Sequence, residues 1–201
     1  MQNHLIIFIK NPVLGTVKTR LAMSIGDEKA LEVYNDLIQK CQEETLKVEC
    51  TRHLFYSKNI SENDSWLIAD FEKEIQADGD LGDKITSAFY NVFKEKEKEK
   101  EKVIIIGSDC YDLDAATINE AFEKLDHSDV VIGPANDGGY YLLGINDFHP
   151  ELLQNITWST EDVLAETIER ANSKKLSMSL LKELIDLDTL EDLEKSGYSL
   201  R

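Results

Sequence analysis

Short apolar runs separated by longer amphipathic stretches are the main pattern along this chain. The clearest run, residues 103–106, is four β-branched side chains followed by Gly107 and a polar turn. A short apolar run that ends at glycine is typical of a strand buried on both faces of a parallel sheet. We therefore predict a central strand here, and the polar residues after it should lie at the carboxyl edge of the sheet.

Similar runs predict further strands, and helical patterns separate them. The expected strands are residues 4–9, 51–56, 71–77, 129–133, 141–145 and 176–182. Apolar residues spaced three and four apart predict a long helix that Asp27 caps. Later helices are expected from about Lys84, from Ala115, from about Thr160 with Ser159 or Thr160 as its cap, and after Thr189. Strands that alternate with helices predict one α/β domain over residues 1–201, with a doubly wound, mostly parallel sheet.

Composition and charge narrow the class of protein. An apolar fraction of 42% and a charged fraction of 30% describe an ordinary globular domain, and no apolar run is long enough to span a bilayer. The net charge of −17 argues against a nucleic-acid partner. Three cysteines without metal-type spacing and a first segment without signal-peptide features favour the cytoplasm. The alternating Lys and Glu of residues 94–102 have no apolar face, so we expect a solvated extension without function.

The turn after the central strand is the first candidate site. Ser108, Asp109 and Asp112 follow this strand, and open α/β sheets bind ligands just beyond the carboxyl ends of their strands. Asp109 could face a divalent cation there. Asp112 or Asp114 could equally be the N-cap of the following helix.

The loop after the first strand is a second candidate, because it combines glycine with basic residues. The chain has only 22 basic residues, and three of them lie in the eleven positions from 10 to 20. These three are Lys10, Lys18 and Arg20, and Gly15 lies between them. Backbone N–H groups and charged side chains of such a loop can hold phosphates. The alternative is an ordinary surface loop.

Two glycine-rich turns complete the set of candidates. In residues 78–83, Asp80 and Gly82 suit a backbone that approaches a ligand closely, although a capped turn before a helix explains the same residues. In residues 134–144, Asp137 precedes two glycines after a core strand, and Asp-Gly is also the commonest hairpin signal.

Taken together, four segments resemble a known family. They are KNPVLGTVKTRLA, IGSDCYDL, GPANDGGYYLLG with the following ITWST, and LIDLDTLEDL. In this order and spacing they are similar to the small bacterial glycosyltransferase-like proteins of the GT-A (nucleotide-diphospho-sugar transferase) superfamily, often labelled as associated with radical-SAM and arsenosugar genes. The resemblance covers nearly the whole chain.

The resemblance implies roles for individual residues. It implies that Lys18 and Arg20 contact a nucleotide phosphate, and that Asp109 and Asp188 hold Mg²⁺ or Mn²⁺. Asp137 would be the catalytic carboxylate, and a sugar or acceptor would be bordered by Gly138, Gly139 and Tyr140. The chain departs from the family at Tyr111 and Leu190, where a proline is common, and at Lys84, where an arginine is common.

Three functions follow as expectations. The first is a metal-dependent glycosyltransferase that takes a nucleotide-sugar donor and a small-molecule acceptor. The second is a nucleotidyltransferase that joins a nucleoside triphosphate to a phosphorylated or acidic small molecule, which the pair Asp109 and Asp188 favours. The third is a nucleotide-binding module without catalysis. The sequence names neither the base, the sugar nor the acceptor.

Overall fold

The computed structural model describes residues 2–94 and 101–199, in which strands and helices alternate. The strands are β1 Gln2–Ile9, β2 Thr51–Tyr56, β3 Glu72–Ile75, β4 Glu101–Ile106, β5 Val130–Pro134, β6 Tyr140–Ile145 and β7 Met178–Leu180. The helices are α1 Thr19–Ile25, α2 Asp27–Thr45, α3 Leu81–Lys94, α4 Ala115–Lys124, the short 3-10 helix η1 Pro150–Leu152, α5 Val163–Ser173 and α6 Leu190–Lys195. Within these described ranges, no helix is long and apolar enough to cross a membrane.

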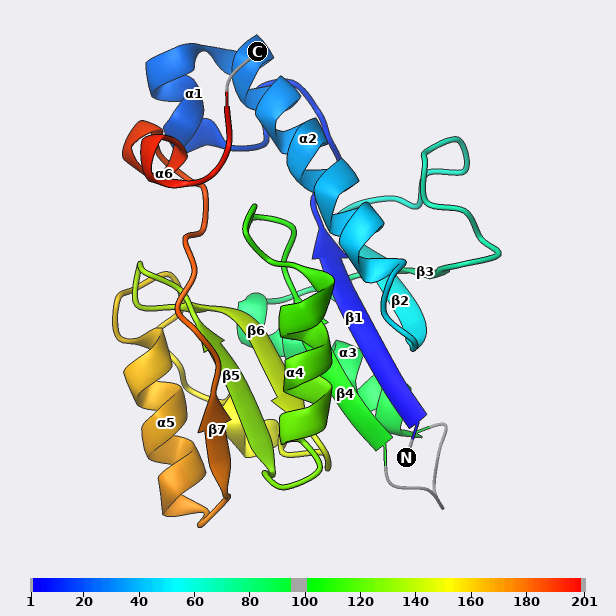
Figure 1. Ribbon diagram of the computed structural model, residues 1–201, viewed down its shortest axis with the longest axis vertical. Coiled ribbons are helices and arrows are strands. Elements are labelled where there is room, and N and C mark those ends of the chain that lie inside the picture. The colour runs from blue at the N-terminus through cyan, green and yellow to red at the C-terminus, as the bar shows by residue number, and fades with distance from the viewer. Residues whose placement is uncertain (1, 95–100, 200–201) are drawn as a thin grey trace.

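The seven strands form one sheet in the order β3-β2-β1-β4-β6-β5-β7. β1 pairs in parallel with β2 and β4, and only β6 runs antiparallel to its neighbours β4 and β5. The predicted α/β class with a mostly parallel sheet is confirmed. The carboxyl ends of β1, β4 and β5 therefore share one edge, and α1 and α6 lie beyond this edge at the top of Figure 1.

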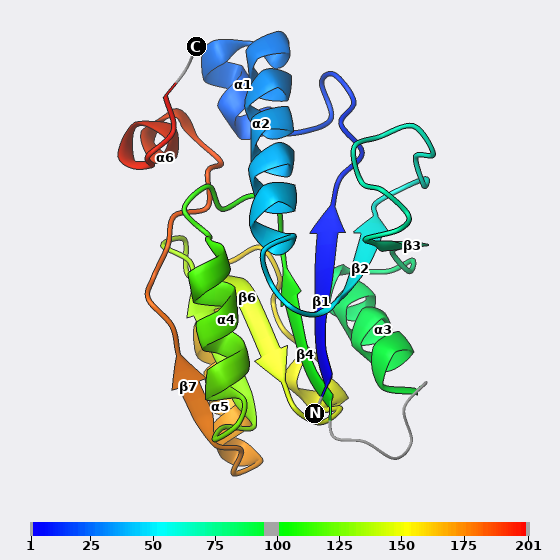
Figure 2. The same cartoon turned by 45° about the vertical axis from the view of Figure 1, so that its right-hand side comes forward.

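Helices cover both faces of the sheet, as a doubly wound fold requires. Apolar residues of α2 and α4 pack on one face, and those of α3 and α5 pack on the other. In Figures 1 and 2, α4 lies in front of the strands. The predicted central strand is fully buried from end to end, because the two cores enclose it from both sides.

One predicted cap of α4 is confirmed, and two other predicted caps need correction. The cap of α4 is Asp114, whose carboxylate accepts a hydrogen bond from the Thr117 N–H at 2.8 Å. α2 has Gly26 as its cap without a side-chain bond, so Asp27 lies in the first turn and is not the cap. α5 begins only at Val163, so the predicted cap near Thr160 is wrong: its hydroxyl donates to the Thr157 carbonyl at 2.7 Å and closes a turn.

The amino end of β4 also differs from the expected solvated extension. Residues 95–100 of the Lys/Glu run lie outside the described residues, but Glu101 and Lys102 are buried within the strand. The Glu101 carboxylate pairs with His4 Nε2 at 3.0 Å, and Lys102 Nζ pairs with Asp126 at 2.5 Å. These partners, which are distant in sequence, compensate the two buried charges. The expected solvated extension was therefore wrong for Glu101 and Lys102.

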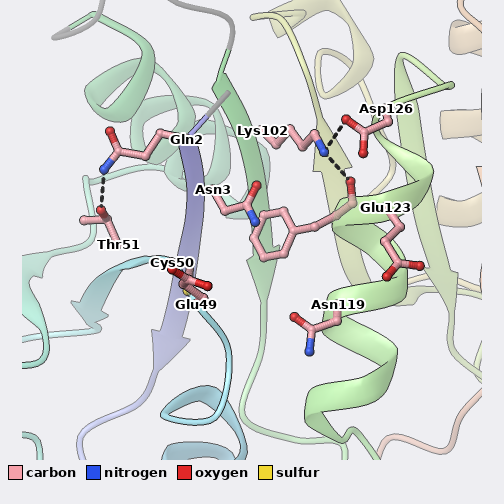
Figure 3. Close-up of a pocket in the computed structure, with 10 residues that line it drawn as sticks. Gln2, Asn3, Glu49, Cys50, Thr51, Lys102, Asn119, Glu123 and Asp126 are labelled. Carbon is pink, nitrogen blue, oxygen red and sulfur yellow. Dashed lines mark hydrogen bonds and ion pairs between the residues drawn. The ribbon is translucent and has the colours of Figure 1, made fainter.

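A cavity of about 720 Å³ lies beside this amino end, opposite the carboxyl edge (Figure 3). The basic residue in its lining is Lys102, and its ammonium is already bound to Asp126 and to the Phe122 carbonyl. Glu49 and Glu123 add further negative charge. The Lys102 ammonium is already paired and acids surround it, so among the described residues nothing in this cavity points to phosphate binding, and the candidate residues all lie elsewhere.

Candidate functional site

Lys18 stands at the centre of the site at the carboxyl edge. It precedes α1 with a left-handed backbone (φ 48°), a conformation that costs energy for any residue with a Cβ atom. Its ammonium is buried and lies 2.5 Å from an Asp109 oxygen and 2.9 Å from an Asp188 oxygen. Burial alone would lower the pKa of Lys18, but the two carboxylates outweigh it and raise this pKa. The lysine is therefore a permanent cation at this position.

Two chain segments bring the carboxylates to Lys18. Asp109 follows β4, and the segment between β7 and α6 crosses it, with the Leu187 N–H donating to the Asp109 carbonyl at 3.0 Å. Cys110 forms an isolated antiparallel bridge with Asp186 in the same crossing. Arg20 from α1 reaches Asp188 from the solvent side at 3.8 Å. Burial would raise the pKa of Asp109, but Lys18 holds it below its usual value, so this carboxylate is ionised.

Asp186 adds a third acid that the sequence did not single out. Its burial, followed by the charges of Asp109 and Asp137, raises its pKa to about 7. Burial is thus the first cause, and the neighbouring carboxylates make ionisation of Asp186 harder still.

Tyr34 ties the long helix α2 to the same edge. Its hydroxyl accepts from the Lys10 N–H at 2.7 Å and donates to the Lys10 carbonyl at 3.0 Å, and it lies 3.3 Å from the Ser108 hydroxyl. Burial and the nearby charge of Asp109 raise the pKa of Tyr34, so the phenol stays neutral. The tyrosine thus fixes the ends of β1 and β4 side by side.

A cavity of about 570 Å³ opens along this edge. Its apolar lining includes Phe8, Ile105 and Leu143, from the three neighbouring strands β1, β4 and β6. The other lining residues include Ser108 and Asp109 on one side, and the 158–163 segment and the loop between β5 and β6 on the other.

The loop between β5 and β6 is a hairpin turn, as its Asp-Gly signal indicates. The Ala135 N–H donates to the Gly139 carbonyl at 3.0 Å, and the Gly139 N–H donates to an Asp137 carboxylate oxygen at 2.9 Å. Asp137, Gly139 and Tyr140 nevertheless line the cavity. The hairpin is therefore confirmed, and the ligand-binding interpretation of this loop stays a prediction.

This chain matches one protein family, and solved structures share its fold. A family of proteins described as uncharacterized and conserved in bacteria, DUF2064, matches residues 39–160, more than half of the chain. The chain belongs to this family. A proposed nucleotide-diphospho-sugar transferase from Desulfovibrio desulfuricans G20 is 30% identical, with a TM-score of 0.87 over 96% of this chain and 85% of that one. The predicted GT-A-like family and transferase class are confirmed.

More distant structures share the fold with this DUF2064 protein. The manganese complex of Rv0371C from Mycobacterium tuberculosis H37Rv is 11% identical, with a TM-score of 0.58 and 97% of each chain covered. The inositol-1-phosphate CTP transferase from T. maritima is 12% identical, with a TM-score of 0.54 over 96% of this chain and 91% of that one. None of the curated proteins matches the chain.

The DUF2064 chain brings only some of the predicted residues together. The cavity lining includes Lys10, Arg20, Ser108, Asp109, Asp137 and Asp188, and Lys18 joins them through its ion pairs. Four other predicted positions are not in this lining, namely Gly15, Asp80, Gly82 and Gly138, and Gly138 instead packs against the backbone of Glu161. Asp80 instead accepts from the Asp83 N–H at 2.9 Å at the start of α3, which is the capped turn considered as the alternative. Gly82 faces Trp158, and the position of its missing Cβ lies 2.6 Å from the indole nitrogen.

Gln76, Trp158 and Glu161 line the cavity although the sequence did not single them out. The side-chain amide of Gln76 donates to the Ile9 and Phe55 carbonyls, both at 3.2 Å, which fixes it at the ends of β1 and β2. The ITWST motif was a usable signal for Trp158. The motif was expected to lead into a helix with Ser159 or Thr160 as its cap.

While the Lys18 ammonium occupies them, Asp109 and Asp188 are suited to a divalent cation only in combination with a ligand. Among the described residues, no group of three or more metal-ligating side chains is arranged around one point. Asp109 and Asp188 do converge, since both lie within 3 Å of the same ammonium. Two carboxylates with phosphate oxygens and water are the usual Mg²⁺ environment, so this pair fits such an ion once a nucleotide supplies the remaining oxygens.

Proposed function

We propose that this DUF2064 protein is a metal-dependent glycosyltransferase that moves a sugar from a nucleotide-diphospho-sugar to a small-molecule acceptor. The observation that carries the proposal is the ammonium of Lys18 between Asp109 and Asp188, at the side of a cavity on the carboxyl edge. The relative at 30% identity, a proposed transferase of this kind, supports the same choice.

The donor diphosphate would lie on the side of the cavity that faces the first loop. Lys10 and Arg20 line the cavity there, and Lys18 lies directly behind Asp109. A protein with a net charge of −17 needs such a local group of cations to accept an anionic donor. Each charge-assisted contact to a phosphate contributes roughly 1.5–3 kcal/mol.

Asp109 and Asp188 would hold Mg²⁺ or Mn²⁺ against the diphosphate. When bound, such an ion neutralises the negative charge that develops on the leaving diphosphate oxygen. Arg20 would add fixed positive charge on the same oxygens, and the buried Lys18 would contribute its charge from behind the two carboxylates.

Asp137 would act on the acceptor. In the transfer, the bond between the sugar C1 and the diphosphate oxygen breaks, and a bond between C1 and the acceptor oxygen forms. The acceptor hydroxyl loses its proton to the Asp137 carboxylate, and the nucleoside diphosphate leaves with the electron pair. One Asp137 oxygen is engaged with the Gly139 N–H, which leaves the other oxygen for the acceptor.

A thermal-shift screen tests the proposal. Nucleoside diphosphates and their sugar derivatives are added with Mn²⁺ or with EDTA to the wild type and to Asp109→Asn. We expect one nucleotide series to stabilise the wild type mainly with Mn²⁺, and the variant to lose the metal-dependent part. Equal shifts with Mn²⁺ and with EDTA would refute the metal-dependent site.

A second function is favoured by the same two aspartates. A nucleotidyltransferase would also place Asp109 and Asp188 beside the phosphates, and it would release pyrophosphate from a nucleoside triphosphate. Glycosyl transfer releases a nucleoside diphosphate. Product analysis by ³¹P NMR therefore separates the two reactions.

A further inference from the structure

Charge is distributed unevenly in the cavity at the carboxyl edge. Its lining has two basic residues, Lys10 and Arg20, and five acids, which are Asp109, Asp137, Glu161, Asp186 and Asp188. Both basic residues lie at the first-loop side: Lys10 acts on the charge of Asp109, and Arg20 approaches Asp188. The opposite side, with Asp137 and Glu161, has acids in its lining and no basic residue.

A basic residue near that side is occupied elsewhere. Arg170 of α5 donates from Nε to the Gln154 carbonyl at 2.9 Å and from a terminal nitrogen to the Glu166 carbonyl at 2.9 Å. It is not in the lining of the cavity. An anion that entered the Asp137 side would therefore meet carboxylates without a compensating cation from the lining.

The 158–161 segment forms a fixed wall on this side, because two glycines allow close contact at its ends. A Cβ on Gly138 would lie 2.2 Å from the Glu161 carbonyl oxygen, and the Leu164 N–H donates to the Gly138 carbonyl at 2.9 Å. At the other end, Trp158 packs directly over Gly82. The wall is thus held by the hairpin and by the first turn of α3.

Aromatic rings accompany the acids on this side. Trp158 and Tyr140 both line the cavity, with their ring centroids 6.4 Å apart and their planes at 77°. Ile85 and Val163 add apolar surface beside them. Aromatic faces beside carboxylates match a ring compound that has apolar C–H faces and hydroxyl groups at its rim, since the carboxylates accept hydrogen bonds from hydroxyls.

We propose that the Asp137 side of the cavity is an acceptor subsite for an uncharged, hydroxyl-bearing ring, such as a sugar or a cyclitol, and that it rejects phosphorylated rings. This rests on the proposed function, because it names the acceptor of that reaction. Trp158 and Tyr140 pack against the ring, Asp137 and Glu161 accept from its hydroxyls, and a phosphate group is repelled by the same two acids.

Matched pairs of probes test the subsite. Methyl glucoside is compared with glucose 6-phosphate, and myo-inositol with myo-inositol 1-phosphate, by saturation-transfer NMR on the wild-type protein. We expect at least one neutral ring to bind and its phosphorylated partner to bind at least about tenfold more weakly, because like charges without a counter-ion oppose binding. The subsite would be overturned if the phosphorylated rings bound as tightly as the neutral rings or more tightly. It would also be overturned if none of the four compounds bound.

A charge-reversal variant should gain affinity for a phosphorylated probe, and a misfolded protein would show no such gain. Glu161→Lys should bind the phosphorylated probe better than the wild type, whereas Glu169→Lys, with the same charge change on the exposed side of α5, should not. No gain in Glu161→Lys, or an equal gain in both variants, would contradict the assignment. Nucleotide binding by the wild-type protein is measured on the same samples and distinguishes the two proposals. A wild-type protein that binds no nucleotide would contradict the proposed donor function. A wild-type protein that binds nucleotide but prefers phosphorylated rings would overturn the acceptor subsite alone.

Discussion

Replacing Lys18 by methionine tests the central arrangement of the site. The change keeps the length of the side chain but removes the cation between Asp109 and Asp188, which lie 2.5 and 2.9 Å from it. Removing one partner of a buried ion pair costs about 3–5 kcal/mol. The two aspartate side chains are 38% and 42% exposed, so water screens part of this cost, and we expect a loss of about 1–3 kcal/mol.

The assay is thermal unfolding with and without Mn²⁺. A loss of 1 kcal/mol lowers the melting temperature by roughly 2–4 °C in a chain of this size. We expect Mn²⁺ to stabilise Lys18→Met more than the wild type, because the two carboxylates no longer have a competing cation. Lys18→Gly separates the causes, since glycine relieves the left-handed backbone while it also removes the charge. Lys29→Met, at an exposed position of α2, is the control. A Lys18→Met protein that is as stable as the wild type and indifferent to Mn²⁺ would refute the reasoning.

Three further predictions concern the hairpin and helix α2. Asp137→Asn should keep the hydrogen bond from the Gly139 N–H and therefore the free energy of unfolding, but turnover should fall about tenfold or more. A variant with wild-type turnover would show that Asp137 only shapes the turn. Gly138→Ala should lower the free energy of unfolding, measured by urea titration, by several times more than Gly26→Ala. Both glycines have φ near +87°, but only at Gly138 would the added Cβ meet a backbone atom at 2.2 Å. Equal losses in the two variants would contradict this contact. Hydrogen bonds from Lys40 and Lys47 lower the pKa of Glu44 to about 2, so its stabilisation is complete above about pH 4.5 and is lost as the pH falls toward 2. Glu44→Gln should therefore be less stable than the wild type at pH 6 by about 1–3 kcal/mol, with the difference vanishing near pH 2; a difference that does not change with pH would contradict this.

The sequence predicted those parts of the fold that depend on local pattern. The residues 103–106 were recognised because both faces of this strand are apolar, and α6 because Thr189 and Asp192 form a local capping box. The start of β4 was missed, since Glu101 and Lys102 are buried only by virtue of partners that come from other elements.

The same distinction holds for the site. Asp109 could be predicted because it directly follows the central strand. The contribution of Asp186 could not, because it arises where the segment after β7 crosses Cys110, about 75 residues away in sequence. Trp158 was missed for a different reason: its segment was expected only to lead into a helix, whereas it forms a turn closed by Thr160 and the indole lines the cavity.

The antiparallel strand β6 has a consequence for how a chain of this type can diversify. Because β6 turns back at once from β5, the loop with Asp137 is a short local connection at the carboxyl edge. Under the proposed function, the cations that would face the donor come from the first loop and α1, more than a hundred residues earlier. Insertions or substitutions in the hairpin would then change which compound receives the sugar while the recognition of the activated donor is inherited unchanged.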